Sequence, residues 1–208
     1  VINKYWSDDA FPFELLPSFK ELGIGGLGYE GYGCAGGSQK LFGFVAMELA
    51  RTDASFCTFF GVHSGLAMGS IYLDGSEEQK QKWLPAMARG EAVGCFGLTE
   101  PGAGSNPAEM ETRARRDGGD WVLDGTKRWI GMGSIADVAV VWAQTDDGIR
   151  GFLVPAGTPG FGAQDIEGKH ALRASLQSEL RFEGCRLPGD AILPTAEGLK
   201  GPFTCLNS

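Results

Sequence analysis

Metal-binding and disulfide-forming residues are scarce in this sequence. Two histidines and five cysteines occur in 208 residues, and no two cysteines have the short spacing of a zinc-ligand pair. We therefore expect no metal site. The odd number of widely spaced cysteines also argues against a disulfide framework. Reduced thiols indicate a bacterial cytoplasm or an organelle matrix rather than secretion.

Positive charge and long apolar runs are also lacking. Lysine and arginine number 18 against 26 aspartate and glutamate residues, which gives a net charge of −8. We therefore expect no nucleic-acid partner, because nucleic-acid binding needs a basic surface. No apolar run approaches the roughly 18 residues of a bilayer span, and no signal peptide opens the chain. Since the sequence begins at Val1 without Met, we expect a segment to precede it.

The first half of the chain has the apolar periodicity of helices. Apolar residues recur at intervals of three and four over 13–22, and the glycine-rich run 23–37 indicates a loop. From Ser38 onward apolar residues again recur at intervals of three and four. This spacing predicts a helix with one apolar face made of Leu41, Phe44, Val45 and Leu49.

Two further helices are predicted before residue 92. The segment 54–73 is apolar on nearly every side, which indicates a helix buried among others. Ser76 and Gln79 form a capping box, in which the side chain of each residue accepts the backbone N–H of the other. The helix that this box begins ends near Gly90.

The second half of the chain has the composition of strands. We predict an α+β protein with an all-α helical domain at 1–92 and an antiparallel β-barrel-like domain at 93–208. Asp124-Gly125 is predicted to be a turn. The strand-like runs, divided by glycine and proline, are 92–96, 121–127, 138–143, 151–154 and 180–182.

The run 95–106, CFGLTEPGAGSN, is the strongest candidate for a ligand site. Proline fixes φ and glycine permits positive φ, so the run forms a turn after an apolar strand. Its free amides and the hydroxyls of Thr99 and Ser105 suit a polar or anionic ligand. From composition alone, an ordinary surface turn explains the run as well. It is not the dinucleotide fingerprint, because the third glycine is missing.

Three motifs resemble the acyl-CoA dehydrogenase family. Phe96–Ser105 is similar to the family's flavin-binding signature, and Gly125–Ile130 to a second family motif. Tyr32–Gly36 resembles the branch of glutaryl-CoA dehydrogenases and plant short-chain acyl-CoA oxidases. The similarity runs from near Pro12 to Asn207, in family order and spacing. The family's C-terminal helical bundle is absent from this chain, so we expect an exposed apolar face where it would pack.

The resemblance implies FAD as the cofactor and an acyl-CoA as the substrate. Thr99 would stabilise negative charge on the reduced flavin, and Trp129 would pack on the ring. The implied substrate contacts are Cys57, Thr58 and Ser105. The implied cofactor contacts are Phe96, Gly97, Leu98, Thr99, Gly104, Ser105, Trp129, Ile130 and Gly131.

Two positions depart from the family pattern. Gly131 stands where the family usually has a Thr or Ser whose hydroxyl reaches flavin N5. Cys57 stands where glutaryl-CoA dehydrogenases carry an Arg that pairs with the distal carboxylate of the substrate. A thiol cannot form that ion pair. We therefore expect an uncharged short acyl chain rather than a glutaryl group.

The reaction that the resemblance implies is α,β-dehydrogenation to a 2-enoyl-CoA. The family resemblance also implies a homotetramer that passes electrons to an electron-transfer flavoprotein. Two alternatives stay open, an acyl-CoA oxidase that passes electrons to oxygen and a non-catalytic module that has lost flavin. The chain holds no convincing nucleophile–base pair. Since the family's catalytic Glu lies beyond the matched region, we predict no catalytic residue within this chain.

Overall fold

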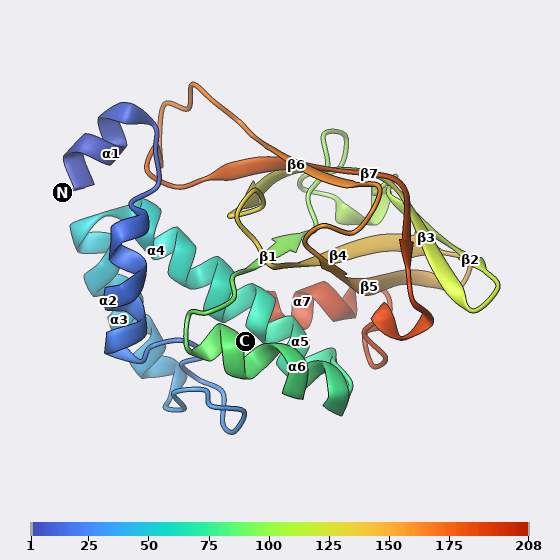
Figure 1. The fold of residues 1–208 in the computed structure, drawn as a ribbon, viewed down its shortest axis with the longest axis horizontal. Helices are drawn as coiled ribbons and strands as arrows, with labels where there is room; N and C mark the ends of the chain where they lie inside the picture. The colour runs from blue at the N-terminus through green and yellow to red at the C-terminus, as the bar shows by residue number, and fades with distance from the viewer. Residues whose placement is uncertain (1, 208) are drawn as a thin grey trace.

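The computed structural model describes residues 2–207, which form a layer of helices beside a curled seven-stranded sheet (Figure 1). Helices occupy residues 2–88, and the strands follow over 94–187. A last helix, α7 (Lys200–Leu206), returns between the two layers. The predicted α+β class, with helices first and strands second, is confirmed.

The helices of the first layer begin and end at residues suited to those positions. Ser38 accepts the Leu41 N–H at 3.2 Å, and Gly23 ends a helix with a φ of 60° that suits glycine. The predicted capping box is confirmed, because Ser76 and Gln79 exchange hydrogen bonds of 2.9 and 3.2 Å. The bounds are α1 Ile2–Asp8, the 3-10 turn η1 Phe13–Leu15, α2 Leu16–Leu22, α3 Gln39–Thr52 and α6 Glu77–Ala88.

Residues 54–74 form one helix with a π-helical middle, made of α4 (Ala54–Phe60), η2 (Gly61–Ala67) and α5 (Met68–Asp74). Its large apolar side chains fill the core as predicted, and Phe60 and Ile71 are fully buried. By length and composition this helix is apolar enough to cross a bilayer, which corrects the expectation of no such run. Half of its most apolar window is buried inside the protein, as in a core helix.

The apolar side of α3 divides into a packed part and an exposed part. Val45 and Leu49 pack against the core, but Leu41, Phe44 and Met47 are 47, 56 and 54% exposed. The predicted common face is therefore wrong for Leu41 and Phe44. At 3.6 residues per turn the packed and the exposed apolar residues lie on adjoining parts of the helix surface. The apolar stripe of α3 is therefore wider than the surface that the core covers. An exposed apolar stretch therefore lies on α3, and the packing of the family's C-terminal bundle against it stays a prediction.

The sheet is mixed, with order β1-β4-β2-β3-β7-β6 and with β5 paired to β4. β1 runs parallel to β4, so the domain is not purely antiparallel. The two strands start side by side, because Val93 O accepts the N–H groups of Asp137 and Val138. The bounds are β1 Gly94–Gly97, β2 Arg113–Asp117, β3 Asp120–Gly131, β4 Val138–Thr145, β5 Gly148–Pro155, β6 Phe161–Asp165 and β7 Gln177–Leu187, with 3-10 turns η3 Pro107–Glu109 and η4 Gly189–Ala191.

β3 runs without a break through Asp124-Gly125, so the predicted turn there is wrong. The register between β3 and β7 shifts at this point, as in a β-bulge. Gly125 has a φ of 145°, and a Cβ on it would lie 2.6 Å from the Thr112 Cα. The hairpin turn falls instead at Gly118-Gly119, between β2 and β3.

One buried side chain ties the helical layer to β1. His63 Nε2 lies 3.0 Å from Met87 O, and His63 Nδ1 accepts the Gly94 N–H at 3.2 Å. Since a carbonyl can only accept, the proton resides on Nε2. Burial lowers the pKa of His63 to about 4, although the bond to Met87 opposes this shift. His63 is therefore a structural residue.

Candidate functional site

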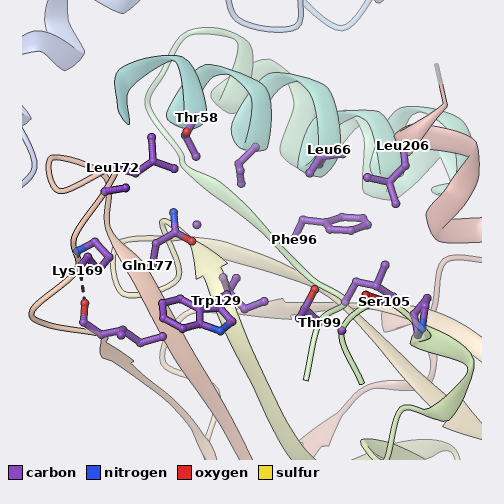
Figure 2. Close-up of a pocket in the computed structure, with 18 of the residues that line it drawn as sticks. Thr58, Leu66, Phe96, Thr99, Ser105, Trp129, Lys169, Leu172, Gln177 and Leu206 are labelled. Carbon is purple, nitrogen blue, oxygen red and sulfur yellow. Dashed lines mark hydrogen bonds between the residues drawn. The ribbon is translucent and has the colours of Figure 1, made fainter. Parts of the chain in front are cut away.

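A cavity of about 840 Å³ lies between the long helix 54–74 and the sheet (Figure 2). The helix forms one side, and β1 with the end of β3 forms the opposite side. The β6–β7 loop and α7 close the two ends. The lining residues are Thr58, Val62 and Leu66; Phe96, Leu98, Thr99, Gly104, Ser105 and Pro107; Trp129, Ile130 and Gly131; 166–172 with Gln177; and Phe203 and Leu206.

Most of the predicted site residues meet around this cavity, but Gly97 and Cys57 do not line it. Gly97 is packed within the sheet, where a Cβ would lie 3.4 Å from Lys127 Cγ. The Cys57 thiol turns toward α3 and donates to Ala46 O at 3.3 Å. Neighbouring side chains on a helix diverge by about 100°. Thr58 therefore faces the cavity and Cys57 does not.

Trp129 presents its indole to the cavity (Figure 2), and the residue is 52% exposed. Its φ of 63° is rare for a bulky residue. Arg128 holds it there, since its N–H donates to Thr99 O at 2.8 Å and its guanidinium binds Glu179 at 2.6 Å. The register of β3 against β7 is interrupted at this point. A strained backbone that displays an aromatic ring marks a candidate functional position.

A buried ion pair fixes the loop on both sides of Thr99. Lys127 Nζ lies 2.7 Å from Glu100 Oε1 and also donates to Leu98 O at 3.1 Å. Glu100 accepts the Thr112 N–H as well. Burial lowers the pKa of Lys127 to about 8, opposed by Glu100. Burial alone would raise the pKa of Glu100, but Lys127 holds it below its usual range. Both groups are therefore charged at neutral pH.

Several residues that line the cavity were not predicted from the sequence. Val62 and Leu66 follow Thr58 at helical spacing of four, so helix geometry alone predicts that they share its face. Gln177 and the loop 166–172 had no comparable signal. They reach the cavity only because β6 and β7 are neighbours in the sheet.

The space beside Gly131 is filled by its neighbours. A Cβ on Gly131 would lie 3.0 Å from Val62 Cγ2 and 3.6 Å from Gln177 Nε2. The Gln177 amide lies in the cavity near Trp129 (Figure 2) and donates to Ser175 Oγ at 3.1 Å. A side chain at position 131 would therefore press on Val62, although Gly131 itself lines the cavity.

The cavity is largely apolar, with a few polar groups at its edge. The Thr99 and Ser105 hydroxyls form no hydrogen bond within residues 2–207. The ionisable lining groups Glu167, Lys169 and His170 all belong to the β6–β7 loop. Among the described residues, no group of three or more potential ligands could hold a metal ion. This arrangement suits a largely apolar ligand with a polar edge.

Solved structures share this fold. The chain is similar to a glutaryl-CoA dehydrogenase from Mycobacterium smegmatis in complex with FADH2, with 56% identity and a TM-score of 0.97 over 99% of this chain and 53% of that one. It is also similar to butyryl-CoA dehydrogenase from Megasphaera elsdenii, with 32% identity and a TM-score of 0.86 over 96% of this chain and 54% of that one.

Sequence comparison identifies the family. Family models for the acyl-CoA dehydrogenase N-terminal and middle domains match residues 1–91 and 95–185. The human mitochondrial short-chain specific acyl-CoA dehydrogenase is 40% identical over 190 residues, covering 86% of this chain and 46% of that protein. The chain belongs to the acyl-CoA dehydrogenase family, and it spans about half the length of the curated relatives it matches.

Proposed function

We propose that this chain forms the helical and β-domain part of an FAD-dependent dehydrogenase that converts a short-chain acyl-CoA to a 2-enoyl-CoA. The observation that carries this proposal is the meeting of the two predicted flavin motifs, 96–105 and 129–131, on one cavity. The relative from M. smegmatis was solved with FADH2, which supports the same cofactor here.

The residues of the cavity fit a flavin. The Trp129 indole offers a face for stacking, and the Thr99 and Ser105 hydroxyls are free to donate to polar ring atoms. Gly104 has no atom within 4 Å of a Cβ position, which leaves its backbone open to a phosphate group. Bound FAD would supply the hydride acceptor of the reaction.

Each side chain then has a defined task. Thr99 donates to the ring edge that gains negative charge, and the Lys127–Glu100 pair keeps Thr99 in place. Phe96, with neighbouring apolar side chains of the helix and α7, excludes water from the reacting atoms. Among the described lining residues Glu167 is the one carboxylate, and it is exposed on a loop. We therefore propose that the base that removes the α-proton comes from outside this chain.

This assignment of the base predicts that residues 1–208 alone do not turn over acyl-CoA. The measurement is dehydrogenation of butyryl-CoA by the purified 208-residue chain, followed with an artificial electron acceptor. Turnover by this chain would show that it contains the base. Activity that appears only in a longer protein supports a base elsewhere.

An uncharged short acyl chain fits the cavity better than a glutaryl group. No arginine lines the cavity among the described residues, and Lys169 is already paired with Asp9 at 2.7 Å. Burying an unpaired carboxylate costs several kcal/mol, or roughly a hundredfold or more in specificity. We expect a higher kcat/KM for butyryl-CoA than for glutaryl-CoA. The opposite order, with release of carbon dioxide from glutaryl-CoA, would overturn this choice.

We propose an electron-transfer flavoprotein as the acceptor, with oxygen as the alternative. The relatives named as dehydrogenases support this choice of acceptor. Oxygen consumption without an added acceptor would instead favour an oxidase. By family resemblance we propose a homotetramer in a bacterial cytoplasm or an organelle matrix. Cys34, Cys57, Cys95 and Cys185 form no disulfide, which agrees with a reducing compartment.

Thr99→Val tests the cofactor assignment. Loss of one preorganised donor at the charge-gaining edge should lower flavin content or slow flavin reduction by roughly a hundredfold. Absorbance near about 450 nm reports both quantities. Thr126→Val, on β3 outside the cavity, is the matched control. Unchanged flavin content and reduction in Thr99→Val would contradict the assignment, and a protein that takes up no FAD would support the non-catalytic alternative.

A further inference from the structure

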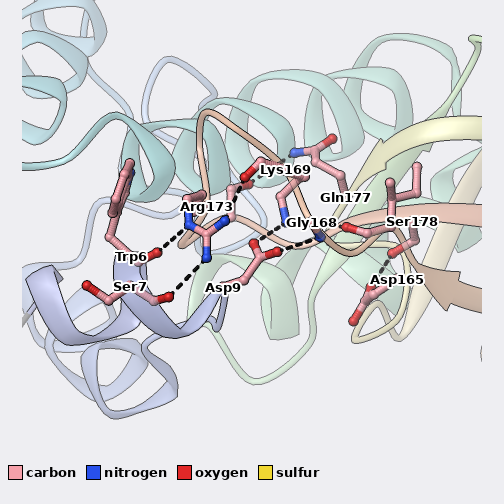
Figure 3. Close-up of polar contacts among 11 residues, drawn as sticks. Trp6, Ser7, Asp9, Asp165, Gly168, Lys169, Arg173, Gln177 and Ser178 are labelled. Carbon is pink, nitrogen blue, oxygen red and sulfur yellow. Dashed lines mark hydrogen bonds and ion pairs between the residues drawn. The ribbon is translucent and has the colours of Figure 1, made fainter.

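A segment that the proposed function does not use lies against one wall of the cavity. The loop 166–172 forms that wall, and residues 6–9, at the end of α1, contact the loop and its continuation (Figure 3). Lys169 and Asp9 are 160 positions apart in the sequence. The contact therefore joins two distant parts of the chain.

Asp9 binds the loop with both carboxylate oxygens. Oδ2 accepts the Gly168 N–H at 2.9 Å, and Oδ1 accepts from Lys169 Nζ at 2.7 Å. The side chains of the ion pair are only 16 and 8% exposed. Burial alone would raise the pKa of Asp9, but the hydrogen bond and charge of Lys169 hold it below its ordinary value. The contact is thus charge-assisted at neutral pH.

Arg173 makes a second anchor beside the first. Its Nε and Nη2 donate to the carbonyls of Trp6 and Ser7 at 2.8 and 2.9 Å, and Nη1 donates to Lys169 O at 2.8 Å (Figure 3). One planar guanidinium therefore joins both segments in a fixed geometry, whereas a lysine would offer a single mobile ammonium. Since α1 has no buried residue, these polar contacts rather than core packing hold it to the loop.

The loop side of the contact has strained backbone. Leu172 has a φ of 49°, in the left-handed region that bulky side chains rarely adopt. Asp9 has a φ of 53°, but it caps the end of α1, where Ala10 N–H donates to Tyr5 O at 3.0 Å. Leu172 lies between the anchors Lys169 and Arg173, and it lines the cavity. Such conformations persist where the surroundings over-determine them. The two anchors supply that constraint.

We propose that residues 6–9 act as a clamp that fixes the loop 166–172 as a wall of the cavity, with Asp9 and Arg173 as positioning residues. Released from the clamp, the loop leaves its strained conformation, and Leu172 and Lys169 withdraw from the wall. The clamp is a property of the chain itself. Its effect on flavin release rests on the proposed function.

Hydrogen–deuterium exchange of the full chain tests the clamp. Asp9→Ala should raise exchange in the loop 166–172 by about tenfold, because it removes two charge-assisted bonds from partly buried groups. Asp8→Ala removes the neighbouring exposed carboxylate and is the matched control. Loop exchange that is equal in Asp9→Ala and the unmodified protein overturns the proposal.

Asp9→Asn distinguishes a local effect on the loop from a general loss of stability. The amide oxygen keeps the bond to the Gly168 N–H but loses the charge pair with Lys169. A smaller rise confined to the loop, with exchange in β4 unchanged, supports the clamp. An equal rise throughout β4 and the loop means that Asp9 acts on overall stability, and it overturns the clamp.

Flavin release separates this proposal from the proposed function. In protein that carries FAD, release should be several-fold faster in Asp9→Ala than in Asp8→Ala. Faster loop exchange in a protein that binds no FAD supports the clamp and removes the proposed function. Unchanged loop exchange in flavin-loaded protein removes the clamp and leaves the proposed function standing.

Discussion

At the scale of single residues, His63 should make stability depend on pH between about 4 and 6.5. Its pKa is about 4 in the folded protein against 6.5 ordinarily. Above pH 6.5 the imidazole is neutral in both states. As the pH falls, the unfolded chain binds a proton that the folded protein does not, so stability is lost. The loss approaches about 3 kcal/mol, measured by urea unfolding at neutral and acid pH.

Two substitutions separate this titration from packing. In His63→Gln the amide can donate to Met87 O and accept the Gly94 N–H, but it does not titrate, so the pH slope should flatten. His63→Leu leaves the Gly94 N–H buried and unpaired, while Met87 O keeps the Gly90 N–H at 2.9 Å, so it should cost about 1–3 kcal/mol at every pH. A full pH slope retained in His63→Gln would contradict the assignment.

Lys127 should matter far more for stability than an exposed cation. Lys127→Met leaves Glu100 buried without its counterion and should cost about 3–5 kcal/mol. The double variant with Glu100→Gln should recover part of that loss, because no charge is then buried. Arg51→Ala breaks an exposed pair with Glu48 and should cost less than about 1 kcal/mol. Denaturant unfolding compares them, and similar losses for Lys127→Met and Arg51→Ala would contradict this account.

At the scale of elements, replacing a glycine by alanine should destabilise the protein in one helix and stabilise it in another. A Cβ on Gly201 in α7 would lie 2.5 Å from Trp142 Cζ3, a rigid ring atom, so Gly201→Ala must displace α7 and should cost about 1–3 kcal/mol. Gly43 in α3 has no atom within 4 Å of its Cβ position. Gly43→Ala should therefore stabilise the protein by about 0.5–1 kcal/mol. Thermal unfolding of both variants checks the signs.

The sequence predicted those elements whose signals are local. Ser76 with Gln79 and Gly23 mark helix ends through bonds and conformations within a few residues. Asp124-Gly125 has the composition of a turn, but the closeness of Thr112 from another strand makes it a bulge. Parallel pairing of β1 with β4 depends on where the chain re-enters the sheet. No local pattern contains that information.

The same limit applies to the candidate site. The motifs 96–105 and 129–131 could be identified from the sequence because each is a continuous stretch. Cys57 and Thr58 were both predicted to contact the substrate, but neighbouring side chains on a helix point in different directions. Thr58 faces the cavity and Cys57 faces α3. The loop 166–172 reaches the cavity through sheet pairing alone, so its part in the site could not be predicted.

At the scale of the whole molecule, the exposed face of α3 should promote self-association of the 208-residue chain. Leu41, Phe44 and Met47 are each about half exposed on one helix, and contiguous apolar surface of this kind favours association. Phe44→Ser with Met47→Ser should lower the apparent mass by sedimentation or light scattering. Lys40→Ser with Glu48→Ser, on the same helix and without net charge change, is the control. Equal association in all three proteins would contradict this role of α3.

The parallel pairing of β1 with β4 also affects the order in which the parts of the chain fold during synthesis. Val93 and Asp137, where the two strands begin, are 44 positions apart. At about 5–20 residues per second, a ribosome needs roughly 2 to 9 s to make that stretch. Through this interval the helical layer can form, but β1, which is entirely buried in the finished protein, has no neighbouring strand to pair with. The strand that leads into the flavin motif must therefore wait for later synthesis, and the cavity closes late in folding.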